Sequence, residues 1–227
     1  MHMEFQDILI FVHVLLFGYW LGSDLGVFFC DSQLTRDDLS LDERLRVREI
    51  RRKVDMAPRT CAPLILPIGF TLVLQHGSQI TGGWLVMIWV LSLAWLAMLW
   101  IEKFTIGTPK EWALNRINRV LWFVVAAAMT ALGIYALING EPVAQGWLAL
   151  KLALYGLMVL SATWILHAAD LWEPIFEMVR AGGEQAVEGE KRMKKNRINA
   201  GSAAVTLWCV VLLIAFLLVR PTGLLRA

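Results

Sequence analysis

The chain has 227 residues, of which 58% are hydrophobic and 11 are Trp, and its formal net charge is +2. Soluble domains carry a smaller apolar share, so the composition excludes an ordinary soluble protein and indicates a single integral membrane domain over residues 1–227. No basic run forms an organised face for nucleic acid, which is therefore not an expected partner.

Six apolar segments have the length of a membrane-spanning helix, which is roughly 20 residues for a hydrocarbon core about 30 Å thick. In chain order they are Gln6 to Cys30, Cys61 to His76, Trp84 to Ile101, Val120 to Ile138, Gly146 to Ala168 and Ala203 to Val219. Pro63 and Pro67 each remove a helix donor, so we expect the second segment to be kinked or partly re-entrant. The sequence predicts an all-α fold, a polytopic membrane bundle of about six transmembrane helices.

The connecting segments alternate between basic and non-basic. Segments 31–59, 102–119 and 170–198 are rich in Lys and Arg, whereas 77–83 and 139–146 contain neither. Basic loops stay in the cytoplasm, so this alternation predicts cytoplasmic loops at 31–59 and 170–198 and both termini outside.

Two short helices are expected within the cytoplasmic loops. Ser40 followed by Glu43 forms a capping box, which predicts a helix from that point toward Val54. A second short helix is expected near LWEPIFEMV, ending at the pair Gly182 and Gly183.

Polar side chains inside apolar segments are costly in lipid and mark candidate sites. Counted from the outer ends at 1.5 Å per residue, His13 is about 10 Å deep and Lys151 about 7 Å deep, so they share one level. His76 lies near the outer mouth of the second segment. Two imidazoles and an amine therefore gather in the outer half of the predicted bundle.

Each of these residues also has a purely structural interpretation. His13 can hydrogen-bond a neighbouring helix, His76 can lie at the membrane interface, and Lys151 can extend its amine to the surface. Toward the cytoplasmic side, Asp24 is expected to pair with an Arg or Lys of the adjacent loop, and His167 is expected at the interface.

An imidazole and an amine at the same depth of a helix bundle are groups that could bind a haem. Neutral His is a common axial ligand of haem iron, and His13 is the candidate here. Lys151 could neutralise a propionate or, as a neutral amine, be the second iron ligand; His76 and Met158 are other candidates for that ligand. Trp20 and Tyr155 are expected to line the slot.

Three stretches resemble a known family. VHVLLFGYWLG, REIRRKVDMAPRTCAPLILPIGFTLVL and GWLALKLALYGLMVL are similar to the first helix, the charged loop with its Pro-containing second helix, and the Trp-x-x-x-Lys-Leu helix of the HemJ-type protoporphyrinogen oxidases. They cover roughly a third of the chain. The resemblance implies a membrane protein that binds haem b, related in architecture to the CopD-like group, with the functional His and Lys at His13 and Lys151. It also implies a bacterial inner (plasma) membrane.

Three functions stay open. The first is a b-type haem protein that transfers electrons or oxidises a porphyrinogen, which would make it a membrane oxidoreductase. The second is a CopD-like transporter of a metal ion or small solute, and the third is a non-catalytic anchor subunit of a larger complex. Expected partners are the lipid bilayer and either a redox subunit or further copies of the chain.

Overall fold

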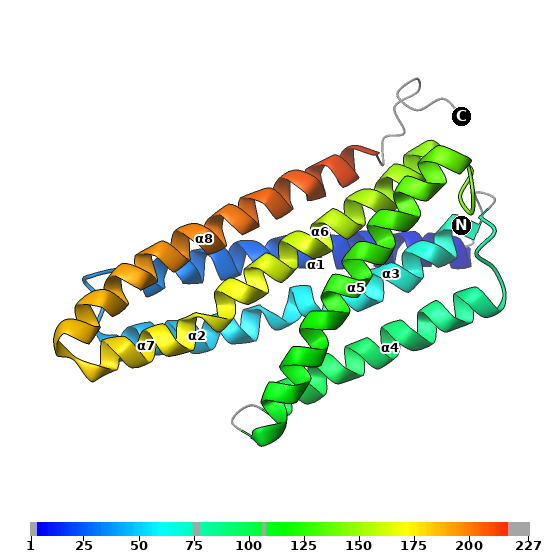
Figure 1. Ribbon diagram of the computed structural model, residues 1–227. Helices are drawn as coiled ribbons and strands as arrows, with labels where there is room; N and C mark the ends of the chain where they lie inside the picture. The colour runs from blue at the N-terminus through cyan, green and yellow to red at the C-terminus, as the bar shows by residue number, and fades with distance from the viewer. Residues whose placement is uncertain (1–3, 75–77, 106–107, 218–227) are drawn as a thin grey trace.

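The computed structural model describes residues 4–74, 78–105 and 108–217, and Figure 1 shows them as a bundle of helices. Eight helices and no strand are found in this part of the chain. They are α1 (Phe5–Leu34), α2 (Leu41–Val54), α3 (Met56–Val73), α4 (Gly83–Phe104), α5 (Pro109–Asn139), α6 (Gly146–Asp170), α7 (Trp172–Ala181) and α8 (Gly183–Phe216). The predicted all-α fold is confirmed.

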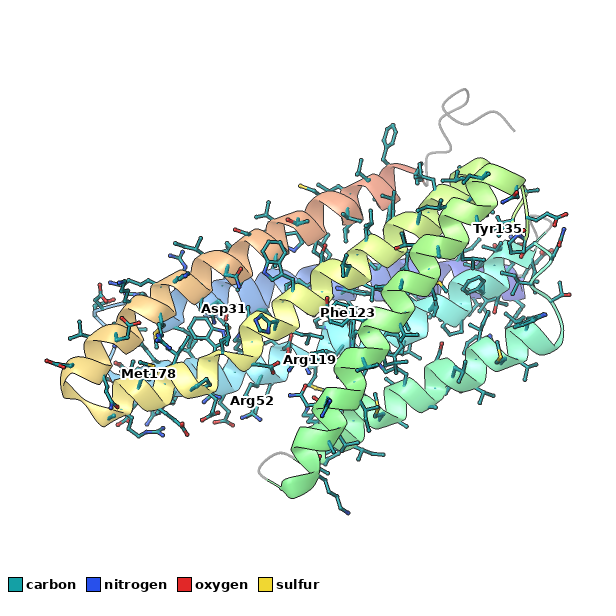
Figure 2. All side chains as sticks on the ribbon, viewed as in Figure 1. Asp31, Arg52, Arg119, Phe123, Tyr135 and Met178 are labelled. Atoms are coloured by element: carbon teal, nitrogen blue, oxygen red, sulfur yellow. The ribbon has the colours of Figure 1, made fainter. Side chains whose placement is uncertain are left out.

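Six helical segments are long and apolar enough to cross a membrane, with α2 and α3 together counted as one of them. Their outer surfaces expose many large apolar side chains, including Phe123 and Tyr135 on α5, which Figure 2 labels. Lipid tails solvate such a surface, whereas water would drive it to aggregate. The chain is therefore a multi-pass membrane protein with the six spans that the sequence predicts.

The two basic segments 31–59 and 170–198 meet at one end of the bundle, which we call the basic end. Figure 2 places Asp31, Arg52 and Met178 there. α1 begins and α8 finishes toward the opposite end, as Figure 1 shows. The positive-inside rule predicts that the basic end faces the cytoplasm.

α2 begins with the predicted capping box. The N–H of Glu43 donates to the Ser40 hydroxyl at 3.4 Å, and the Ser40 N–H donates to the Glu43 carboxylate at 2.8 Å. Two backbone donors at the helix start are thereby satisfied. The helix ends at Val54, which confirms the short helix predicted for this segment, and Asp55 joins it to α3.

α3 runs through Pro63 and Pro67 as one helix, and both prolines are fully buried. The Thr71 hydroxyl donates to the Pro67 carbonyl at 2.8 Å and accepts a hydrogen bond from the Trp89 indole of α4 at 3.1 Å. The carbonyls that Pro63 and Pro67 free are those of Arg59 and Pro63, so the Thr71 bonds do not replace the missing ones; they tie α3 to α4 in the turn after Pro67. α3 extends from the α2 junction to Val73.

α8 is much longer than the apolar segment from Ala203 that predicted it, since it already starts at Gly183. Its polar first half packs against α7, the second predicted short helix. A close approach at Gly189, where a Cβ would lie 2.9 Å from Val179, holds the two helices together. Arg44 of α2 also bonds Glu190 of α8 at 2.7 Å, which ties both basic segments together.

α5 and α6 pack closely through small residues. A Cβ added to Gly133 would lie 2.3 Å from the backbone nitrogen of Ala153, and one added to Gly156 would lie 2.2 Å from the Thr130 hydroxyl. Membrane helices approach this closely only where such residues leave their backbones uncovered. This contact fixes α6, and therefore Lys151, relative to the rest of the bundle.

Candidate functional site

A cavity of about 280 Å³ lies between α1, α3 and α6, in the half of the bundle away from the basic end. We call it the His13 cavity. Its wall is largely apolar, and its polar side chains include an imidazole, an amine and a phenol. The lining residues used below are His13, Gly69, Lys151, Tyr155 and Met158.

His13 turns its ring into the space between α1 and α3. Its Nδ1 is buried and has no hydrogen-bond partner among the described residues. A Cβ added to Gly69 of α3 would lie 3.2 Å from His13 Cε1, so glycine at this position leaves the room that the ring occupies. A buried imidazole nitrogen without a partner is what a ligand would satisfy.

Lys151 and Tyr155 lie one turn apart on α6, and both line the His13 cavity. No carboxylate of residues 4–74, 78–105 and 108–217 pairs with Lys151. The Tyr155 hydroxyl donates to the Ala62 carbonyl at 3.0 Å, next to Pro63 of α3. This hydrogen bond joins α6 to α3 beneath the cavity and orients the phenol.

Of the other predicted site residues, only Met158 is shown to line the His13 cavity. Trp20 is buried in the main core against Cys61 and Ala62, and it does not line the cavity. His76 lies outside the described residues. His167 is exposed on the last turn of α6, near the basic end.

Asp24 is 7% exposed, and its Oδ2 is buried without a hydrogen-bond partner in the described part of the chain. The sequence predicts pairing with a loop Arg or Lys. Arg51 of that loop instead pairs with Asp31, which is the next carboxylate along α1 toward the basic end. Both members of this pair are buried.

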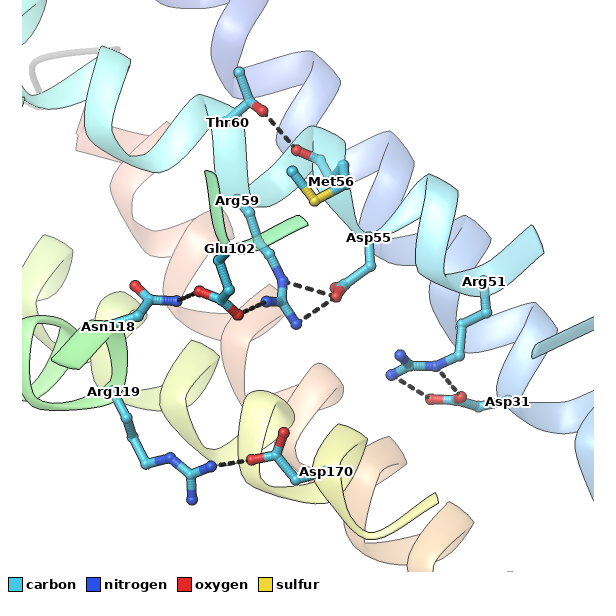
Figure 3. A network of polar contacts seen from close by, with 10 residues as sticks. All are labelled: Asp31, Arg51, Asp55, Met56, Arg59, Thr60, Glu102, Asn118, Arg119 and Asp170. Carbon is cyan, nitrogen blue, oxygen red and sulfur yellow. Dashed lines mark hydrogen bonds and ion pairs between the residues drawn. The ribbon is translucent and has the colours of Figure 1, made fainter. Parts of the chain in front are cut away.

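A polar network crosses the basic end between α3, α4 and α5 (Figure 3). Arg59 pairs with Asp55 at 2.7 Å and with Glu102 at 3.6 Å. The Asn118 amide donates to Glu102 at 2.9 Å and accepts from the Trp95 indole at 3.3 Å. A second cavity of about 960 Å³, which we call the basic cavity, is lined by Arg51, Asp55, Arg59, Glu102 and Asn118 among others.

Sequence reasoning missed Glu102 and Asn118 as site residues. Glu102 directly follows one predicted apolar span and Asn118 shortly precedes the next, so the sequence assigns both to the basic loop between the spans. The helices continue through both positions and bury both side chains. The signal that could have found the pair is a carboxylate at the end of one span and an amide donor at the start of the next, because a short connection can bring the two together.

The residues of the His13 cavity fit a haem in their chemistry. A porphyrin supplies four nitrogen ligands to iron, so one imidazole with an unpartnered nitrogen suffices on the protein side. Lys151 offers a cation or an amine, and the rest of the wall is apolar. Ligand pockets measure about 300–1,000 Å³, so 280 Å³ is small, and a group of haem size fits only with part of it outside this cavity.

Comparison of the chain with protein-family models, with curated proteins and with solved structures gives no match. The similarity to HemJ-type oxidases therefore stays a prediction from the quoted sequence stretches. What the structure adds is the meeting of His13 and Lys151 at one cavity of a multi-pass membrane bundle.

Proposed function

We propose that the chain is a membrane haem protein that binds haem b at the His13 cavity and transfers electrons within the bilayer. The observation that carries this proposal is the buried, unpartnered Nδ1 of His13 on the wall that Lys151 shares. An imidazole in that condition lacks a hydrogen-bonding role within the described protein, and a haem iron would give it a role as a metal ligand instead.

The residues around the cavity have distinct proposed roles. A bound haem supplies one-electron redox chemistry. His13 ligates the iron, and Gly69 leaves room for its ring. Lys151 holds an anionic substituent by its charge, or serves as the second ligand by its amine. Tyr155, tied to Ala62, fixes the floor beneath them.

The proposed redox role has two forms. For both, the proposed location is a bacterial inner membrane. In one, the chain oxidises a porphyrinogen, as its resemblance to the HemJ-type family implies. In the other, it passes electrons as the anchoring subunit of a larger complex. The apolar outer surface of the long helices suits either lipid or such a subunit.

A transporter is the second candidate, and the polar residues of α4 and α5 favour it. Ser92 is buried within the apolar span of α4, and Glu102 and Asn118 are buried just beyond the apolar spans of α4 and α5. With Asp24 and the His13 cavity, they give the bundle polar groups at several levels. Transport of a metal ion or small solute across the membrane of proteoliposomes by the cofactor-free protein would support this candidate over the haem proposal.

The haem proposal is tested by visible spectra of the detergent-purified protein, expressed with haem supplied, in oxidised and reduced forms. We expect reduced α and Soret bands in the wild type, their loss in His13→Ala, and their retention in His167→Ala. The control removes an exposed imidazole on α6 that does not line the cavity. A colourless wild type, or a His13→Ala variant with unchanged bands, contradicts the proposal.

A further inference from the structure

The inner face of α1 carries a row of polar residues. His13, Trp20, Asp24 and Asp31 are spaced by seven, four and seven residues, so they fall on one face of a helix with 3.6 residues per turn. Asp24 lies about 16 Å along the axis from His13, since each residue adds 1.5 Å. It is therefore well separated from the His13 cavity and belongs to the half of the bundle at the basic end.

No cation forms an ion pair with Asp24 in the described part of the chain, and the one side-chain donor that acts on its carboxyl is the uncharged Trp20 indole. Asp24 is 7% exposed, and its Oδ2 is buried with no hydrogen-bond partner among the described residues. The nearby cation, Arg51, already pairs with Asp31. Removing an ionised carboxylate from water without a partner is far more costly than burying the neutral acid.

The neighbours of Asp24 come from the junction of α2 and α3 and from α1 itself. The Trp20 indole, one turn earlier on α1, donates toward its carboxyl. The charged groups that act on it are Asp55 and Arg51, and it also interacts electrostatically with the Cys61 thiol of α3. Asp31 lies two turns further along α1. Arg51 pairs with Asp31 and Arg59 pairs with Asp55, so the two guanidinium groups are matched by two other carboxylates, which further favours a neutral Asp24.

The junction of α2 and α3 packs against α1 beside Asp24. A Cβ added to Gly26 would lie 3.0 Å from Val54, so α1 rests directly on the end of α2 two residues after Asp24. Asp55 and Arg51, the charged groups that act on Asp24, also line the 960 Å³ basic cavity. The same two residues therefore interact electrostatically with the buried carboxyl and line the polar space at the basic end.

We propose that Asp24 is a proton-binding site inside the bundle, neutral at rest, which exchanges its proton with water at the basic end through the Asp55 and Arg51 junction. The exchange is a simple ionisation: the Asp24 O–H bond breaks, water of the basic cavity accepts the proton, and the reverse step restores the acid. No electron moves, so the inference does not require a haem and goes beyond the proposed function.

A proton fits this position better than a metal cation. Alkali and alkaline-earth ions require several oxygen ligands, and no group of three His, Cys, Asp or Glu side chains able to hold a metal is found in residues 4–74, 78–105 and 108–217. Asp55 is already engaged by Arg59 at 2.7 Å. One free carboxyl oxygen is sufficient for a proton.

The test is infrared spectroscopy of the purified protein without added haem, at neutral pH, in H₂O and D₂O. We expect a carbonyl band of a protonated carboxylic acid in the wild type, which shifts to lower frequency in D₂O. Asp24→Asn should abolish this band, because it replaces the neutral acid by an amide of the same shape. Asp24→Glu should keep a protonated band and move its frequency.

Asp37→Asn is the matched control, since it removes an exposed carboxylate at the same end of the molecule. This variant should keep the band. Absence of any protonated carboxyl band in the wild type, or its survival in Asp24→Asn with a normal size-exclusion profile, overturns the proposal. A band that belongs to Asp24 but stays unshifted after long incubation in D₂O overturns the proposed exchange with the basic end.

Discussion

Lys151 places an amine on the wall of a largely apolar cavity, and such a group is costly in a membrane helix unless something faces it. We expect Lys151→Met to weaken haem retention by about tenfold or more, the effect of losing roughly 1.4 kcal/mol of interaction with a propionate. Lys151→Arg keeps a charge and should keep both haem and spectrum. The measurement is haem titration of the purified variants by absorbance.

A Lys151→Arg variant that retains haem but shows a changed reduced spectrum would contradict the role as counter-charge. The amine would then be the second iron ligand, because a guanidinium stays protonated and cannot replace it. Met158 of the same cavity serves as the control, since Met158→Leu should leave the spectrum unchanged if Lys151 or its charge is what matters.

Asp31 and Arg51 form an ion pair whose side chains are only 6% and 3% exposed. Asp31→Asn leaves the guanidinium buried without its counter-charge, and removing one partner of such a pair costs about 3–5 kcal/mol. We expect a clearly lowered unfolding midpoint in detergent. The exposed pair of Arg36 and Asp38 provides the control, because Asp38→Asn should leave the midpoint unchanged.

Recovery of stability in a double variant would confirm that the unpaired charge causes the loss of stability in Asp31→Asn. The double variant Asp31→Leu with Arg51→Met removes both charges and should recover a large part of the lost stability, because apolar replacements of a buried pair are often neutral. A double variant no more stable than Asp31→Asn would show that the pair is needed for a reason other than charge burial.

At the level of single residues, the sequence identifies His13 and Lys151 by depth, but it cannot show that Arg51 selects Asp31 over Asp24. Both carboxylates lie on the same face of α1, seven residues apart. The choice depends on where α2 meets α1, which the closeness of Gly26 and Val54 sets. Periodicity within one helix carries no information about that contact.

The contact of α5 and α6 is an element-scale feature that a single methyl group can break. Gly156→Ala would put a Cβ 2.2 Å from the Thr130 hydroxyl and 2.6 Å from the Ala126 carbonyl, which is backbone and cannot turn aside. Overpacking typically costs about 1–3 kcal/mol, so we expect a lower unfolding midpoint. The displacement of α6 should also weaken any ligand bound near Lys151.

The matched control is Gly18→Ala on α1, where an added Cβ meets nothing within 4 Å. Its midpoint should stay the same or rise by up to about 1 kcal/mol of stability, as alanine favours a helix over glycine. Equal losses in both variants would mean that Gly156 matters through its backbone freedom and not through the approach of the helices.

The elements themselves were largely predictable, because apolar runs and capping residues act locally. Each of the six predicted spans overlaps one apolar helix of the described residues, and both predicted short helices are present, although α3 and α5 begin at Met56 and Pro109, before the predicted starts. The first half of α8 was not predicted, since its polar residues from Gly183 onward read as a loop. It is helical because Met193 and neighbouring positions bury one stripe against α7 and α1. Tertiary packing, absent from any local pattern, decides this segment.

For the whole molecule, the charge pattern predicts that the basic end faces the cytoplasm. Single-cysteine variants in a background without Cys30, Cys61 and Cys209 test this with a membrane-impermeant thiol reagent. Glu141→Cys, exposed at the opposite end, should react in intact cells or right-side-out vesicles. Asp37→Cys, exposed at the basic end, should react only after the membrane is opened.

If Asp37→Cys is labelled in sealed vesicles and Glu141→Cys is protected, the orientation is the reverse of the predicted one. The proton site of Asp24 would then open to the outside and the His13 cavity to the cytoplasmic half. The two cavities could not be foreseen from the sequence, because each is enclosed by residues of several helices. Depth along one axis gave the level of His13 and Lys151, but not the enclosed space between them.

The ion pairs of the basic end close at different moments of synthesis. Arg51 follows Asp31 by 20 residues, whereas Glu190 follows Arg44 by 146. At about 5–20 residues per second, the first pair is available within roughly 1–4 s and the second only after roughly 7–30 s. The Asp31 carboxylate near the end of α1 can therefore be neutralised by Arg51 soon after both residues have been synthesised. The bond of α8 to α2 locks the bundle only as translation nears its end.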